Sequence, residues 1–126
     1  GERVIFNKIV YAMDDPHRGD VVIIQQSPKN YVKRVIGMPG ETIEIENGRL
    51  YIDGEIYQQH FLSDEVIAQT SNFGPLEIPE DNYFVMGDNR LISKDSRNGL
   101  GFIPRDDIIG KPELIIYPLR EFGWID

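Results

Sequence analysis

The residues from Gly87 to Arg97 carry two hydroxyl groups, two aspartates and two arginines within eleven positions. A strand-like apolar run, Tyr83 to Met86, ends immediately before them. A simple hairpin turn does not need so many reactive and charged side chains, so their density indicates a functional site. The alternative is a surface loop, in which Asp, Asn and Gly occupy turn positions and the arginines neutralise the carboxylates. The residue chemistry of this segment alone does not separate the two interpretations.

A second segment, Tyr31 to Glu41, places Lys33 inside a strand-like apolar run that a Pro-Gly turn closes. Lysines usually avoid such positions, because desolvation disfavours the ammonium form. A neutral lysine is a base, and beside a serine it can take the proton of the nucleophile and return it to the leaving amine. The alternative is a lysine that extends from an edge strand into water.

The two segments resemble the lysine box and the Gly-Asp-Asn-Arg box of the bacterial type I signal peptidases, the Ser-Lys proteases of the secretory pathway. In that family the first box reads approximately Tyr-Val-Lys-Arg-Val-Ile-Gly-Leu-Pro-Gly-Asp, from which this chain departs mildly at Met38 and Glu41. The second box reads Gly-Asp-Asn-Arg-x-x-Ser-x-Asp-Ser-Arg, and the chain matches every fixed position. The resemblance runs from Gly1 to about Pro118 and is to the short form of Gram-positive bacteria.

The resemblance implies a role for each residue of the site. Lys33 matches the general base, whose pKa must fall to roughly 7 to 8, and Ser93 matches the serine that orients the lysine amine. Tyr31 and Val32 match residues that line the pocket for the small residue before the cleaved bond. The residues expected to support the site are Arg34, Asp88, Arg90, Asp95 and Arg97. An aspartate beside the base would keep it protonated, so the four of them other than Arg90 are expected to pair with one another.

The nucleophilic serine of the family lies in a Ser-Met-x-Pro-Thr-Leu box, upstream of the pair that corresponds here to Gly1-Glu2. The 126 residues do not contain that box. We therefore expect a catalytic-domain fragment that lacks the serine box and the membrane anchor and is inactive by itself. One alternative is a non-catalytic homologue that binds a secreted or pilus-type polypeptide. Another is a self-cleaving repressor with similar chemistry, which would carry a DNA-binding domain upstream.

Short segments rich in Val, Ile and Tyr, separated by turn residues, predict an all-β protein. The resemblance implies the fold shared by signal peptidases and repressor autoproteases, with antiparallel sheets, partly barrel-like, and little helix. Asn47-Gly48 predicts a two-residue hairpin, and the stretch from Gln58 to Phe73 is expected to be a loop with one helical turn opening at Ser63. Without internal repeats, residues 1–126 are expected to form one domain. The predicted strands are Arg3 to Tyr11, Asp20 to Gln26, Tyr31 to Met38, Thr42 to Glu46, Arg49 to Asp53, Asn82 to Gly87 and Glu113 to Tyr117.

The composition limits the partners. With 126 residues, of which 40% are hydrophobic, the chain can bury one core, and no apolar run approaches the roughly 18 residues of a membrane helix. The net charge of -8 argues against nucleic acid. Two histidines and no cysteine give no metal-ligand spacing, and no cofactor is expected. The resemblance implies that the partners are the signal peptides of preproteins, and that an absent N-terminal anchor holds the domain on the extracytoplasmic face of the cell membrane.

Overall fold

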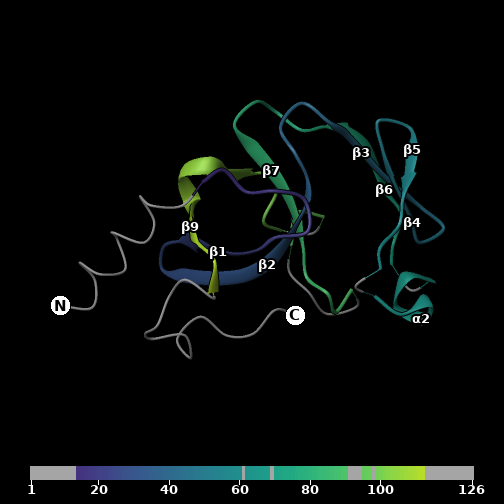
Figure 1. Cartoon of the computed structure of the whole chain (residues 1–126), viewed down its shortest axis with the longest axis horizontal. Helices are drawn as coiled ribbons and strands as arrows, with labels where there is room; N and C mark the ends of the chain where they lie inside the picture. Colours follow the sequence, from purple (N-terminus) through teal and green to yellow (C-terminus); the bar gives the residue numbers. More distant parts are fainter. Residues whose placement is uncertain (1–13, 61, 69, 91–94, 98, 113–126) are drawn as a thin grey trace.

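The computed structural model describes residues 14–60, 62–68, 70–90, 95–97 and 99–112 of the chain. Two antiparallel sheets and one short helix make up this part of the protein (Figure 1). The strands are β1 (Val21–Gln26), β2 (Lys29–Gly37), β3 (Thr42–Glu46), β4 (Arg49–Ile52), β5 (Glu55–Tyr57), β6 (Phe73–Glu77), β7 (Asn82–Met86), β8 (Ile103–Pro104) and β9 (Ile108–Gly110). The helix is α2 (Asp64–Ala68), and a single 3-10 turn, η1 (Arg105–Asp107), precedes β9.

The first sheet has the strand order β8-β7-β2-β1-β9, so β2 lies at its centre. The second sheet has the order β5-β4-β3-β6 and lies beside the first in Figure 1. All pairings between these strands are antiparallel, which confirms the all-β prediction. The two sheets do not close into a barrel within the described residues, so the barrel-like part of the expectation is replaced by two open sheets.

The chain turns between β3 and β4 at Asn47-Gly48, as the sequence predicts. Both residues have a positive φ, 53° and 80°, which is the backbone of the mirror-image turn that matches the twist of a hairpin. The alternation along the two strands places Ile43, Ile45, Leu50 and Ile52 in the core. The predicted hairpin is therefore confirmed together with its register, in which Glu46 pairs with Arg49.

The predicted strands in the described part are all present, within two residues at each end. The predicted strands at Arg3 to Tyr11 and at Glu113 to Tyr117 lie outside the described residues. The strands β5, β6, β8 and β9 were not predicted, because three of them have only two or three residues and β6 contains a Gly-Pro pair. The helical turn expected at Ser63 is confirmed: the Ser63 Oγ accepts a hydrogen bond from the Val66 N–H at 3.3 Å, at the start of α2.

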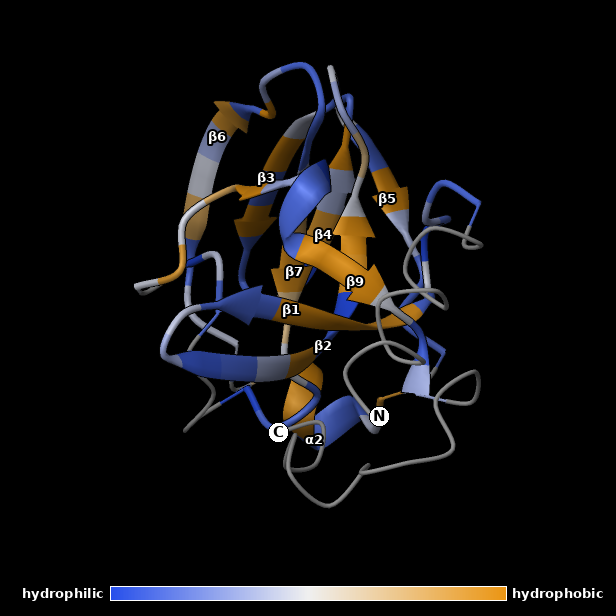
Figure 2. Ribbon diagram, turned by 90° about the vertical axis from the view of Figure 1, so that its left-hand side faces the viewer, coloured by the Kyte–Doolittle hydropathy of each residue, from blue (hydrophilic) through white to orange (hydrophobic). Residues whose placement is uncertain are grey.

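Two clusters of buried side chains form the core. The first joins the two sheets, because Ile36 and Phe84 of the first sheet pack with Ile43 and Leu50 of the second. The second cluster contains Val22, Ile24, Val35, Tyr83, Val85, Ile103 and Ile108, and it lies on the first sheet. Figure 2 shows the hydrophobic residues of β1, β4, β7 and β9 that contribute to these clusters. The second cluster is the one that bears on function, since it surrounds the middle of β2.

Two matched turns give a test of what the hairpin glycines do. Gly48 and Gly54 have nearly the same φ, 80° and 83°, but a Cβ at Gly48 would collide with the Ile67 backbone carbonyl, whereas a Cβ at Gly54 would meet nothing within 4 Å. We expect Gly54→Ala to cost about 1–2 kcal/mol through the left-handed backbone alone. Gly48→Ala should cost more, because the end of α2, which contains Ile67, must also move. Urea denaturation measures both, and equal losses would contradict the role of the contact with Ile67.

Candidate active site

Lys33 occupies the central strand of the first sheet and is 4% exposed. Its partner on β1 is Val22, and strand alternation places Tyr31 and Val35 on the same face as Lys33. Val22 and Val35 belong to the second core cluster, and Tyr31 packs against it. The lysine therefore lies in apolar surroundings, and the alternative of an edge-strand lysine extending into water does not apply. Such surroundings favour the neutral amine over the ammonium ion.

The neighbouring residue on β2, Arg34, points to the opposite face and makes a two-pronged ion pair with Asp88. The Arg34 Nε lies 3.0 Å from Asp88 Oδ1, and Arg34 Nη2 lies 2.8 Å from Asp88 Oδ2. The Arg34 Nη1 also donates to the Gly19 carbonyl oxygen at 3.0 Å. One guanidinium thus joins β2, the segment after β7 and the turn before β1. The expected pairing of supporting residues is confirmed here.

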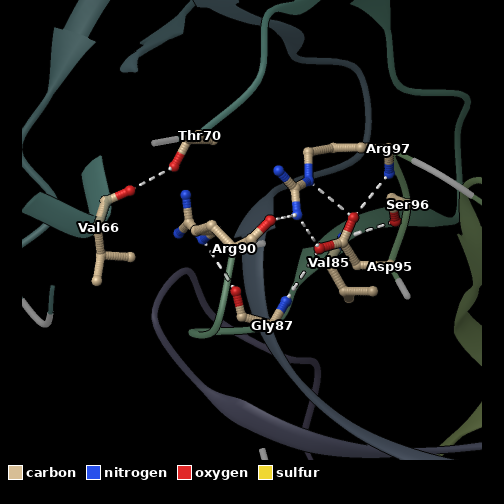
Figure 3. A network of polar contacts seen from close by, with 8 residues as sticks. All are labelled: Val66, Thr70, Val85, Gly87, Arg90, Asp95, Ser96 and Arg97. Carbon is tan, nitrogen blue, oxygen red and sulfur yellow. Dashed lines mark hydrogen bonds and ion pairs between the residues drawn. The ribbon is translucent and has the colours of Figure 1, made fainter. Parts of the chain in front are cut away.

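Asp95 is completely buried and forms the centre of the polar network in Figure 3. Its Oδ1 accepts from Arg97 Nε at 2.9 Å and its Oδ2 accepts from Arg97 Nη2 at 2.8 Å. The backbone N–H groups of Gly87 and Arg97 donate to the same carboxylate, at 3.2 Å and 3.0 Å. These bonds fasten the segment around Asp95 to the end of β7, and they confirm the second expected pair.

Ser96 adds a third connection between this segment and β7. Its Oγ accepts a hydrogen bond from the Val85 N–H at 2.9 Å, and its own N–H donates to the Val85 carbonyl at 3.0 Å. Ser96 is buried, and these two bonds give it a structural part within the site.

Arg90, the remaining supporting residue, takes no part in these ion pairs. The side chain is 4% exposed, and its Nε donates to the Gly87 carbonyl at 2.9 Å. Its Nη1 and Nη2 are buried and have no hydrogen-bond partner. Burial, and to a smaller extent the neighbouring Arg97, lower the pKa of Arg90 to about 10. Arg90 therefore supports the loop through Gly87, and its charge has no carboxylate partner among the described residues.

The structure brings together six of the predicted site residues, on β2 and on the segments that follow β7. Of the others, Ser93 lies outside the described residues. Tyr31 is partly buried, and Val32 is 5% exposed; the two side chains alternate, so only Tyr31 shares the face of Lys33. The six residues are Lys33, Arg34, Asp88, Arg90, Asp95 and Arg97.

One pair that supports this region was not predicted. Arg18 makes two hydrogen bonds with the Glu41 carboxylate, at 2.6 Å and 2.8 Å. Arg18 also donates to the Ile36 carbonyl at 3.2 Å and lies over the ring of Tyr57, 5.4 Å from its centre. The pair connects the end of β2 to the second sheet. The sequence does contain the two opposite charges, but nothing in their spacing of 23 residues indicates that they meet.

No group of three potential metal ligands occurs among the residues that the structure describes. Within the same residues, no helix has the length and the apolar character that crossing a bilayer requires.

A family model described as signal peptidase, peptidase S26, matches residues 1–117. The chain belongs to the signal peptidase family. This confirms the resemblance drawn from the two boxes, and it makes the protein a homologue of signal peptidases.

Individual relatives agree with this assignment. Signal peptidase I P of Bacillus subtilis subsp. natto is 44% identical over 127 residues, which cover 94% of this chain and 69% of that protein. Signal peptidase I T of Bacillus subtilis (strain 168) is 44% identical over 130 residues, which cover 96% and 67%. The crystal structure of a signal peptidase I from Enterococcus faecalis V583 has a TM-score of 0.66 at 32% identity, covering 79% of this chain and 97% of that one. The fold of this signal peptidase homologue is thus that of a solved family member.

Proposed function

We propose that this protein is the catalytic domain of a serine endopeptidase that cleaves N-terminal signal peptides from secreted preproteins with a Ser-Lys dyad. The observation that carries the proposal is the burial of Lys33 on the apolar face of the central strand. A lysine in these surroundings is suited to hold a free amine at neutral pH. The ion pairs of Arg34 with Asp88 and of Arg97 with Asp95 connect the segments that follow β7 to the sheet that carries Lys33.

In the proposed reaction, Lys33 takes the proton from the hydroxyl of a serine that lies upstream of Gly1. The serine oxygen attacks the carbonyl carbon of the scissile bond, and the protonated lysine returns the proton to the leaving amine. Water then hydrolyses the acyl-enzyme, again with Lys33 as the base. Backbone N–H groups near the serine would stabilise the oxyanion. Ser93 is proposed to orient the Lys33 amine by a hydrogen bond.

The proposed substrate is an extended signal-peptide segment that ends in an Ala-x-Ala pattern. Such a segment can bind along a sheet through its main chain, while alternate side chains enter shallow pockets. Tyr31 and Val32 are proposed to line the pocket for the last alanine, and Tyr31 is the one that shares the face of Lys33. We further propose that an N-terminal anchor holds the domain on the extracytoplasmic face of the cell membrane.

Activity should therefore depend on residues upstream of Gly1. We expect the 126-residue chain to fold without cleaving a preprotein that carries Ala-x-Ala, because it has no Ser-Met-x-Pro box. The same chain extended upstream through its own serine box should cleave after the last alanine. Mass spectrometry of the two preprotein fragments identifies the peptide bond that is cleaved.

Specific cleavage by the 126-residue chain would show that the nucleophile has been placed wrongly. Binding of the preprotein to the extended chain without any cleavage would favour the alternative of a non-catalytic homologue.

A further inference from the structure

One buried cation close to β2, Arg90, forms no ion pair with a carboxylate of the described residues. The charged residues beside β1 are Asp20 and Lys111, and those beyond β7 are Asp88, Arg90, Asp95 and Arg97. The strand β2 itself carries Arg34 and, exposed at its start, Lys29, and the titratable Tyr31 and Tyr83 lie on β2 and β7. At the end of β2, Arg18 pairs with Glu41. The other ion pairs are Arg34 with Asp88, Arg97 with Asp95, and Lys111 with Asp20 at 3.2 Å. The terminal nitrogens of Arg90, in contrast, are buried and have no hydrogen-bond partner.

The position of Arg90 follows from the register of the central strands. Arg34 pairs with Met86, so the same antiparallel register continued by one residue places Lys33 opposite Gly87. Opposite residues have their Cα atoms about 5 Å apart, and the Gly87 carbonyl accepts the hydrogen bond from Arg90 Nε at 2.9 Å. The Arg90 guanidinium therefore lies on the order of 10 Å from the Lys33 Cα. In Figure 3 its outer nitrogens point away from the Asp95 carboxylate.

Arg90 keeps its charge at the pH at which a lysine base must work. Its pKa of about 10, lowered first by burial and then by Arg97, is still well above neutral pH. Both Arg90 and Lys33 are 4% exposed, so solvent and salt screen their interaction less than they screen charges at the surface.

We propose that Arg90 acts as a positioning residue for charge: its unpaired, buried guanidinium disfavours the ammonium form of Lys33 and so keeps the base deprotonated. This inference rests on the proposed role of Lys33 as the general base. Protonation of Lys33 would bring a second positive charge into the region in which the charge of Arg90 is buried. At about 10 Å and an effective dielectric constant of about 20, Coulomb repulsion lowers the pKa of a lysine by roughly one unit. The hydrogen bond to Gly87 alone would have no such effect.

The experiment is a direct titration of Lys33 in this chain, which does not require activity. The protein is labelled with ¹³C at the lysine Cε, the Lys33 signal is assigned by its loss in Lys33→Ala, and its shift is followed with pH by NMR. We expect Arg90→Met to raise the pKa of Lys33 by about one unit. The matched control is Arg49→Met, which removes an exposed arginine on β4 and should leave Lys33 unchanged. An unchanged Lys33 titration in folded Arg90→Met would overturn the proposal.

Two further variants test the proposal if Arg90→Met does not fold. Arg90→Gln removes the charge and retains a donor that can reach the Gly87 carbonyl, and it should raise the pKa of Lys33 in the same way. Asp88→Asn removes a half-buried carboxylate, so it should shift the titration in the opposite direction, to lower pH. If Asp88→Asn leaves the pKa of Lys33 unchanged, nearby charges do not control this pKa. That result would also overturn the proposal.

The extended, active chain gives a second readout. The base must be deprotonated, so kcat/KM rises as the pH passes through the pKa of Lys33. In Arg90→Met this rise of kcat/KM should occur about one pH unit higher. At a pH above the rise, kcat/KM should return to the value of the parent chain. If no cleavage is found for any form of the protein, the proposed function fails, but the NMR titration still tests the effect of Arg90 on Lys33.

Discussion

Replacing Lys33 with alanine is expected to reduce kcat/KM for signal-peptide cleavage by about 10²- to 10⁴-fold or more in the extended chain, because the serine loses its general base. No described histidine can substitute for it, since His17 and His60 are both exposed. The chain should stay folded, because the change removes an amine and leaves the strand pairing intact. Initial rates on a preprotein that carries Ala-x-Ala, together with circular dichroism, measure both quantities.

The matched control is Lys29→Ala, which removes an exposed lysine at the start of the same strand and should leave the rate unchanged. A folded Lys33→Ala protein whose kcat/KM stays within about tenfold of the parent would show that another group is the base.

Replacing Asp95 with asparagine should have the largest effect on stability. The side chain is completely buried and accepts from the Arg97 side chain and from the N–H groups of Gly87 and Arg97. Without its charge, the buried Arg97 joins Arg90 as a cation that lacks a carboxylate. Breaking one partner of a buried ion pair costs about 3–5 kcal/mol. Urea denaturation measures the loss, which is a large part of the roughly 5–15 kcal/mol that stabilises a typical domain.

Two comparisons separate the ion pair from a general effect of the substitution. Asp106→Asn changes an exposed aspartate in η1 and should alter the free energy of unfolding by less than about 0.5 kcal/mol. The double variant Asp95→Asn with Arg97→Gln removes both charges, so it should cost less than the sum of the single changes. Full additivity of the two single changes would mean that the pair contributes nothing beyond its separate side chains.

These charge arrangements indicate why the lysine box and the Gly-Asp-Asn-Arg box lie together. Arg34 and Asp88 are 54 positions apart in the chain, yet their ion pair joins the strand of Lys33 to the loop after β7. The pairs of that loop, with Ser96 bound to Val85, hold it against the same sheet. The strand that carries Lys33 and the loop after β7 are therefore fastened to each other at several points.

The sequence by itself determined the features that depend on neighbouring residues. The Asn47-Gly48 turn follows from two residues that accept a positive φ, and the burial of Ile43 and Leu50 follows from the alternation of the strands. The lysine within an apolar run indicated a buried Lys33, with an edge-strand lysine as the alternative, and the spacing of the residues in the two boxes carried the resemblance to the signal peptidases. Each of these patterns is local, because the period of a strand and the backbone of a turn are set within a few residues.

Only the tertiary structure decided which charges meet. The sequence predicted that Arg34, Asp88, Asp95 and Arg97 would pair with one another, but only the structure shows that Arg34 meets Asp88 and that Arg97 meets Asp95. It also shows that Arg90 is buried without an ion pair to a described carboxylate. The same holds for Arg18 and Glu41, and for the short edge strands β8 and β9, which carry too few residues to show a pattern. An ion pair or an edge strand forms when the packing of distant segments brings two groups within about 3 Å. The distances between segments depend on the whole core, and a single sequence pattern does not contain them.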